Sequence, residues 1–203
     1  MTKTEGSIAA LNDADIRGRL SEWLVDQFAH DQSTVVCHEF SVPRPSARAD
    51  VAVINGRLSG FEIKSDRDSL ARLPQQVASY SAVFERVTLV TTAAHLKKAT
   101  ISVPEWWGIL LAHPTLPLKM VRLARINRGL QIEKAMYLLT CAELQDIAKR
   151  RRCFDFVKMR KAQLITCLCQ AVSETKLMGE IRSLLKRRLS QADRQSHHSL
   201  ADS

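Results

Sequence analysis

The feature that most constrains the fold of this 203-residue chain is the pair of short segments that flank Asn55-Gly56. Asn-Gly between two β-rich runs is the strongest short-range signal for a β-hairpin, because both residues tolerate the positive φ that tight hairpin turns require. Residues 50–54 and 58–65 supply the two runs. We therefore expect two adjacent antiparallel strands in the first half of the chain.

Three charged residues, Asp50, Glu62 and Lys64, interrupt these otherwise apolar strands. Charges on buried strands are costly unless they meet one another or a metal ion. Two carboxylates on adjacent strands, with a lysine two residues after one of them, form a hard-oxygen site suited to Mg²⁺ or Mn²⁺. Such an ion lowers the pKa of a bound water, which Lys64 would orient or activate. The alternative is an exposed hairpin end with an ordinary charge cluster.

The register of the hairpin decides whether this site can exist. With a regular two-residue turn, Asp50 points to the opposite side of the sheet from Glu62. A shift of one residue brings both carboxylates to the same side. A three-residue loop with Gly56 in the left-handed region produces this shift, as does a bulge at Gly60. The metal-site interpretation therefore predicts one of these two irregularities.

Helix and strand patterns alternate around the hairpin, which favours an α/β domain over residues 1–112. The expected elements are an amphipathic helix over 13–29 with an acidic first turn, a strand over 34–40, a helix over 67–85, a buried strand over 87–92, a short helix near His95 and a last strand after Gly108.

Beyond residue 112 the pattern becomes helical. Two prolines, Pro114 and Pro117, predict a boundary and a linker over 113–134. An all-helical extension follows over 135–190. In it, Thr140 and Glu143 form a capping box that opens a helix. Further helices are expected over 159–172 and 174–189. The tail 191–203 is rich in Ser, His, Asp and Gln and is expected to be disordered.

The positive charge is concentrated in this second part of the chain. The net charge is +9 in total. Residues 1–112 contain 12 Lys and Arg against 13 Asp and Glu, whereas residues 113–203 contain 18 against 8. This asymmetry indicates a surface that faces a polyanion, with a merely solvated basic face as the alternative. The expected nucleic-acid contacts flank a basic connector: Lys149, Arg150, Arg151, Arg152, Lys158, Arg160 and Lys161.

Three segments in this order, Arg48-Ala49-Asp50, Phe61-Glu62-Ile63-Lys64 and Gln76-x-x-x-Tyr80, resemble the PD-(D/E)XK nuclease superfamily in its RecB-like form. With Pro104-Glu105-Trp106-Trp107-Gly108, residues 10–112 are also similar to a small bacterial family whose locus-tag-style name begins with "sce". Ala49 stands where the motif has proline. Residues 139–172 weakly resemble the SAP-type helix–extended–helix motif of nucleic-acid-binding proteins.

The resemblance implies a restriction-endonuclease-like αβββαβ core with a mixed central sheet. It implies metal ligands at Asp50 and Glu62, with Lys64 as the catalytic base or water-orienting group. Gln76 and Tyr80 would complete the catalytic site and support its ligands or substrate. Many members of the superfamily have an upstream acid, which we assign to Glu39 as a third metal ligand, with Glu22 as the alternative.

These observations predict a nuclease that depends on Mg²⁺ or Mn²⁺ and hydrolyses phosphodiester bonds in nucleic acid, with DNA as the expected substrate. The alternatives are a catalytically inactive DNA-binding protein with a nuclease fold, and a scaffold whose basic half binds a protein. No apolar run reaches the roughly 18–20 residues that span a bilayer, and the N-terminus lacks the apolar core of a signal peptide. We therefore expect a cytoplasmic protein without a membrane partner. No pattern indicates a homodimer. The five cysteines lack the spacing of iron–sulfur ligands.

Overall fold

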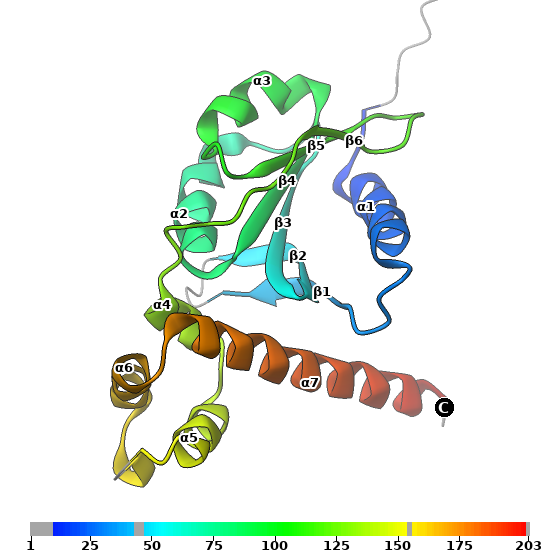
Figure 1. The fold of residues 1–203 in the computed structure, drawn as a ribbon. Coiled ribbons are helices and arrows are strands. Elements are labelled where there is room, and N and C mark those ends of the chain that lie inside the picture. The colour runs from blue at the N-terminus through cyan, green and yellow to red at the C-terminus, as the bar shows by residue number, and fades with distance from the viewer. Residues whose placement is uncertain (1–9, 43–46, 154–155, 202–203) are drawn as a thin grey trace, which may run out of the picture.

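The computed structural model describes residues 10–42, 47–153 and 156–201, with side chains in the last helix described as far as Gln191. Its centre is a six-stranded sheet whose strand order follows the chain (Figure 1). The strands are β1 (Val35–Ser41), β2 (Arg48–Asn55), β3 (Arg57–Lys64), β4 (Arg86–Thr92), β5 (Gly108–Ala112) and β6 (Lys119–Arg122). The helices are α1 (Asp13–Phe28), α2 (Leu73–Val83), α3 (Ala93–Ser102), α4 (Ile132–Met136), α5 (Cys141–Arg150), α6 (Lys161–Ala171) and α7 (Glu174–Ala201), with 3₁₀ turns η1 (Leu70–Arg72) and η2 (Phe156–Lys158).

The sheet is mixed. Strands β1, β2 and β3 pair antiparallel, β3, β4 and β5 pair parallel, and β6 returns antiparallel to β5. Parallel neighbours need crossover connections, which α2 and α3 supply. The expected mixed α/β architecture followed by helices is confirmed. Within the described residues, no helix combines the length and the apolar character needed to cross a membrane.

The hairpin between β2 and β3 has the shifted register that the metal-site prediction requires. Ile54 pairs with Leu58 across the three residues Asn55, Gly56 and Arg57, and Gly56 in the middle has φ +58°. This left-handed conformation is readily adopted only by glycine and a few polar residues. The register continues without a break from the loop to the pair Val51 and Phe61, so the predicted glycine-centred shift is confirmed. The alternative bulge at Gly60 is absent, because Gly60 pairs regularly with Ala52.

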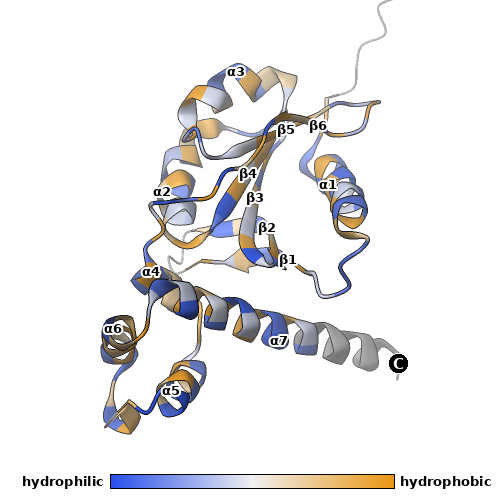
Figure 2. Ribbon diagram, viewed as in Figure 1, coloured by the Kyte–Doolittle hydropathy of each residue, from blue (hydrophilic) through white to orange (hydrophobic). Residues whose placement is uncertain are grey.

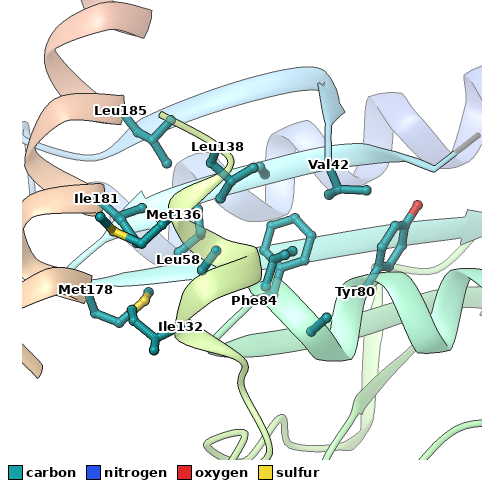
Figure 3. Packing of buried hydrophobic residues seen from close by; sticks show 14 of the residues in the cluster. Val42, Leu58, Tyr80, Phe84, Ile132, Met136, Leu138, Met178, Ile181 and Leu185 are labelled. Carbon is teal, nitrogen blue, oxygen red and sulfur yellow. The ribbon is translucent and has the colours of Figure 1, made fainter. Parts of the chain in front are cut away.

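Two apolar clusters cover the two faces of the sheet. On one face, α1 packs Ile16 and Leu24 against β2, β3, β4 and β5. On the other, a larger cluster joins α2 and α3 to the C-terminal helices, so that Phe84, Met136 and Ile181 share one core (Figure 3). Hydrophobic residues are concentrated in the central strands, whereas α5 and the described part of α7 alternate polar and apolar residues (Figure 2). The helical extension thus covers part of the sheet's apolar face.

The C-terminal helices begin and end close to where the sequence indicated. The Thr140 hydroxyl accepts a hydrogen bond from the Glu143 amide (3.2 Å), and the Glu143 carboxylate accepts one from the Thr140 amide (2.7 Å). The predicted capping box is therefore confirmed. Helix α7 differs from the prediction, because it continues to Ala201 through the tail expected to be disordered. Packing of its first half nucleates the helix, and no proline follows to end it.

Two other boundaries differ from the prediction. The segment expected to be a linker, 113–134, contains β6 and the start of α4. Its prolines only shape the bend before β6, a strand of four residues that is too short to give a clear pattern. The helix expected over 67–85 begins at Leu73 instead. Asp68 closes a turn by accepting hydrogen bonds from Ser65, and Pro74 fits only at the start of a helix.

The helical extension meets the sheet at the hairpin end of β3. Arg182 of α7 donates to both oxygens of the Glu85 carboxylate at 2.9 and 3.0 Å. Glu85 also accepts from the backbone amide of Leu58, the second residue of β3, at 2.8 Å. Lys64 ends the same strand about 20 Å away, at roughly 3.3 Å per residue. The chemistry predicted for Lys64 and the docking of the extension therefore lie at opposite ends of one strand.

Candidate functional site

A cleft of about 460 Å³ opens where β2 begins and β3 ends. Its lining is dominated by charged and amide side chains from α1, β1, β2, β3 and the η1–α2 region. The polar residues among them include Asp13, Glu39, Arg48, Asp50, Glu62, Lys64, Asp68, Arg72, Gln75 and Gln76. Tyr80, the remaining residue expected at the site, is fully buried and reaches it through its hydroxyl. The structure thus brings together all the predicted catalytic residues.

The carboxylate of Glu62 is the centre of a hydrogen-bond network. Its side chain is 2% exposed, and the Lys64 Nζ donates to its Oε1 at 2.5 Å. The Gln76 amide donates to the same oxygen, and the Tyr80 hydroxyl lies 2.7 Å from Oε2. A buried carboxylate with donors on both oxygens has a fixed orientation. Glu62 is therefore held in one position by its own strand and by α2.

Tyr80 supports this network from the buried side of the cleft. Its ring is stacked on Trp107, with centroids 6.1 Å apart and an angle of 10° between the planes. Its hydroxyl also lies 2.7 Å from the backbone carbonyl oxygen of Arg48, at the start of β2. Burial, followed by the charge of Glu62, raises the pKa of Tyr80, so the phenol remains a neutral donor. Tyr80 thus ties the glutamate-bearing strand to the aspartate-bearing strand.

Asp50 lies beside Glu62 on the same side of the sheet, since the hairpin register continued by one step sets them opposite each other. Its Oδ2 accepts a hydrogen bond from the Ile63 amide at 2.6 Å. Burial raises the pKa of Asp50. Burial and then the charge of Asp50 raise the pKa of Glu62, although Lys64 partly offsets this. Perturbed carboxyl groups that lie close together in a cleft are often found at functional sites.

Glu39, the expected upstream acid, also lines the cleft, and its backbone conformation is unusual. It lies on β1 with φ +55°, between residues that pair regularly with β2. A non-glycine residue in this conformation is uncommon and is often found at functional sites. The conformation brings its carboxylate to 2.6 Å from Arg48 and 3.3 Å from Arg17. Glu22, the alternative upstream acid, lies in a separate pocket beside Pro114.

The donor set suits a hard divalent cation, although it is not a complete protein cage. Across the described parts of the chain, no group of three or more His, Cys, Asp or Glu residues is arranged to hold a metal ion. Magnesium usually needs only one or two carboxylates, with water and phosphate oxygens as its other ligands. Asp50 and Glu62 provide these two carboxylates at the edge of an open cleft. They fit such an ion if Lys64 and Arg17 yield part of their contacts.

Two further cations lie at this site, Arg17 and Arg72, and the sequence did not point to Arg17. Arg17 extends from α1 and contacts Asp50 at 3.2 Å. Arg72 ends the η1 turn and lines the cleft, exposed and without an acidic partner among the described residues. Arg17 lies 33 residues before Asp50, so only the packing of α1 on the sheet brings them together. Arg72 lies close to the motif, yet a solvated helix start accounts for its sequence equally well.

The basic residues expected to contact nucleic acid have different environments. Arg150 and Arg151 both form ion pairs with Glu180, at 3.0 and 3.1 Å. Lys161 donates to the Tyr137 backbone carbonyl at 2.9 Å. The other four are exposed and have no acidic partner within the described ranges: Lys149, Arg152, Lys158 and Arg160. These four remain available for a polyanion, whereas the first three also stabilise the helical extension.

Comparison with known proteins relates the chain to a bacteriophage family. Residues 8–201 match the family model described as bacteriophage P4 protein cII. A curated relative, "Protein cII" of Enterobacteria phage P4, is 31% identical over 142 residues, which cover 68% of this chain and 53% of the relative. The match thus spans about half the length of that relative. No solved structure matches the chain.

Proposed function

We propose that this chain, which belongs to the bacteriophage P4 protein cII family, is a divalent-metal-dependent nuclease that hydrolyses phosphodiester bonds in DNA. The observation that carries the proposal is the Gly56 register, which directs Asp50 and Glu62 to the same side of the sheet and into one cleft, with Lys64 two residues further along β3. A regular hairpin would have separated the two carboxylates. The order helix, three antiparallel strands, helix and parallel strand supports a restriction-endonuclease-like core of the PD-(D/E)XK type.

Each residue of the cleft has a role in this proposal. Asp50 and Glu62 would hold Mg²⁺ or Mn²⁺, with Glu39 as the third acid. The bound ion would supply a water of lowered pKa and neutralise charge on the scissile phosphate. Lys64, once it leaves Glu62, would orient the attacking water and offset negative charge that develops in the transition state. Gln76 and Tyr80 would keep Glu62 in place throughout.

The helical extension would contribute affinity rather than chemistry. Its exposed cations, Lys149, Arg152, Lys158 and Arg160, suit phosphate contacts that release counterions and do not depend on base sequence. Because the extension docks at the far end of β3, these contacts would lie away from the scissile bond. We therefore assign substrate binding to both ends of the sheet and cleavage to the cleft alone.

Cleavage by the purified full chain tests the proposal. Supercoiled and linear DNA are incubated with wild-type protein and Mg²⁺ or Mn²⁺, beside Lys64→Ala and the control Lys97→Ala, which changes an exposed lysine on α3. We expect cutting by the wild type and by Lys97→Ala only in the presence of the metal, and cutting by Lys64→Ala that is about 10³-fold slower. Equal cutting by all three proteins would show that Lys64 does not carry the activity and would contradict the proposal.

A second candidate function is DNA binding without cleavage. One observation favours it: protein groups already occupy both oxygens of Glu62, and the Ile63 amide and Arg17 occupy those of Asp50. A site closed in this way would need no metal. Salt-sensitive DNA binding, together with a complete absence of cutting and of Mn²⁺ binding, would establish this function instead.

A further inference from the structure

One arginine is surrounded by the acids of the cleft. The guanidinium of Arg17 enters from α1 and contacts the carboxylates of Asp13 at 3.2 Å, Glu39 at 3.3 Å and Asp50 at 3.2 Å. Its NH1 also donates to the backbone carbonyl of Asp50 at 3.0 Å. A single cation thus joins three acids from three elements, α1, β1 and β2. This cluster is visible only in the structure, because the fold brings together groups that are far apart in the sequence.

The ion pairs of Arg17 stabilise its charge, and its side chain is exposed enough for these contacts to be exchanged. Its side chain is 24% exposed, so water reaches part of it, and its partners Asp13, Glu39 and Asp50 line the cleft. Burial opposes its charge, yet the carboxylates of Asp13, Asp50 and Glu39 outweigh burial and raise the pKa of Arg17. Asp13 lies one helical turn earlier and would keep one end of the guanidinium in place if the other end were released.

We propose that Arg17 is an internal counterion that competes with the divalent ion for Asp50. The inference rests on the proposed metal site and states how that site is regulated. Without metal, Arg17 neutralises the acids that would otherwise repel one another. An ion bound to Asp50 repels the guanidinium and replaces its contact with Oδ1. The freed end of Arg17 then faces the cleft, where a guanidinium can bind a phosphate through two hydrogen bonds.

This arrangement couples metal binding to substrate binding. Arg17 lowers the affinity of the empty cleft for the ion, because the ion must displace it. A phosphate in the cleft offers Arg17 another partner and thereby removes this competition. By linkage, the substrate raises metal affinity and the metal raises substrate affinity by the same factor. The divalent ion would then fully occupy the site in the cleft only when nucleic acid is present.

Calorimetric titration with Mn²⁺ tests the competition on the metal-free full chain without nucleic acid. Arg17→Met keeps an unbranched side chain and removes the charge. Arg19→Met removes the same charge from the same helix, where the guanidinium contacts the carbonyls of Pro114 and Leu116 rather than acids. We expect Arg17→Met to bind Mn²⁺ about tenfold more tightly than wild type, and Arg19→Met to stay within about twofold.

The outcomes separate this inference from the proposed function. Unchanged or weaker Mn²⁺ binding by Arg17→Met, beside clear binding by wild type, overturns the competition and leaves the metal site intact. Absence of binding by every protein overturns both. Binding by Arg17→Met alone supports the competition in its strongest form.

Nuclear magnetic resonance of the wild-type chain gives a measurement that does not depend on how the variant folds. The side-chain Nε–H signal of Arg17 is identified by its loss in Arg17→Met. During titration with Mg²⁺ it should move with the same midpoint as metal binding, while the Arg19 signal stays in place. A stationary Arg17 signal at saturating Mg²⁺ would contradict the displacement.

Discussion

Two buried glutamates at opposite ends of β3 illustrate how one chemical group serves two purposes. Glu62 is 2% exposed near the end of the strand, and Glu85 is 7% exposed beside its start. Each carboxylate accepts a hydrogen bond from a cation. Lys64 donates to Glu62 within the strand, whereas Arg182 reaches Glu85 from 97 residues away in the chain.

The surroundings of the two glutamates differ in one respect. Glu85 is bordered by donors, namely the Leu58 amide, Arg57 and Arg182. Glu62 has donors as well, but it also has Asp50 opposite it and an open cleft beside it. A carboxylate surrounded by donors needs nothing more, whereas two adjacent carboxylates favour an additional cation. The second acid therefore distinguishes the candidate functional end of the sheet from the structural end.

The largest expected difference between the two ends concerns catalysis. Asp50→Ala, Glu62→Ala and Lys64→Ala should each lower the cleavage rate by about 10³-fold, while Glu85→Gln changes it little. If the three residues act on one metal–water unit, as proposed, the double variant Asp50→Ala/Lys64→Ala should be no slower than either single variant. Initial rates on supercoiled plasmid measure the effect, and circular dichroism verifies the fold. A Lys64→Ala protein that cuts at the wild-type rate refutes the mechanism.

The stability of the protein should depend more on the Glu85 end of β3 than on the Glu62 end. Arg182→Ala leaves the Glu85 carboxylate without one of its cations and should lower the free energy of unfolding by about 2–3 kcal/mol. This is less than the roughly 3–5 kcal/mol for a fully buried pair, because Arg182 is partly exposed. Arg187→Ala, an exposed control on the same helix, should change it by less than about 0.5 kcal/mol. Urea denaturation provides both values. Equal losses in the two variants would show that the ion pair does not anchor the extension.

Salt dependence separates binding from chemistry. Glutamate substitutions at Lys149, Arg152 and Lys158 should flatten the slope of log affinity against log salt by about 0.9 for each phosphate that the protein no longer neutralises. The KM should rise more than kcat falls, because these contacts are the same in ground and transition states. Arg150 and Arg151 are unsuitable, since their partner Glu180 would be left unpaired. Glutamate at Lys97 and Lys98 of α3 is the matched control, and an equal effect there indicates general charge rather than a binding face.

The smallest expected effect is a change in the stability of the fold with pH. Because the pKa of Glu62 is raised in the folded protein, protonation of Glu62 stabilises the fold. This stabilisation is fully present below the pKa of Glu62 in the unfolded chain and is lost as the pH rises through its pKa in the folded protein. Without metal, the stability of wild type relative to Glu62→Gln should therefore decline as pH increases from about 4 toward neutrality. Denaturation midpoints in a pH series measure the difference. A difference that is constant with pH would show that burial does not perturb Glu62.

Local signals predicted the site better than they predicted its surroundings. The requirement that Asp50 and Glu62 share a face led to the Gly56 irregularity, and the Thr140 capping box marked the start of α5. Both depend on residues close together in the chain or on a single turn. The motif with Gln76 and Tyr80 correctly indicated that α2 carries groups to Glu62, because the spacing of one helical turn places them on one face.

Long-range contacts were not predictable in the same way. The positions of Arg17 and of the Arg182–Glu85 pair depend on how α1 and α7 pack on the sheet. Strand β6 was missed because four residues give too little periodicity, and the polar tail of α7 resembles a disordered segment by composition. The sequence also indicated a basic extension but not its position, and its helices dock at the end of β3 that is remote from the cleft. Composition indicates how much charge a region has, but not where the fold places it.

Direct measurement of Mn²⁺ binding by electron paramagnetic resonance compares the two glutamates most simply. Wild type, Glu62→Gln and Glu85→Gln are titrated with Mn²⁺ as full chains, and free ion is counted from its signal. If the acid pair at the end of β3 is the metal site, wild type and Glu85→Gln bind one ion with similar affinity and Glu62→Gln loses it. Failure of the wild type to bind Mn²⁺, or equal binding by Glu62→Gln, would contradict the assignment of a metal to this cleft.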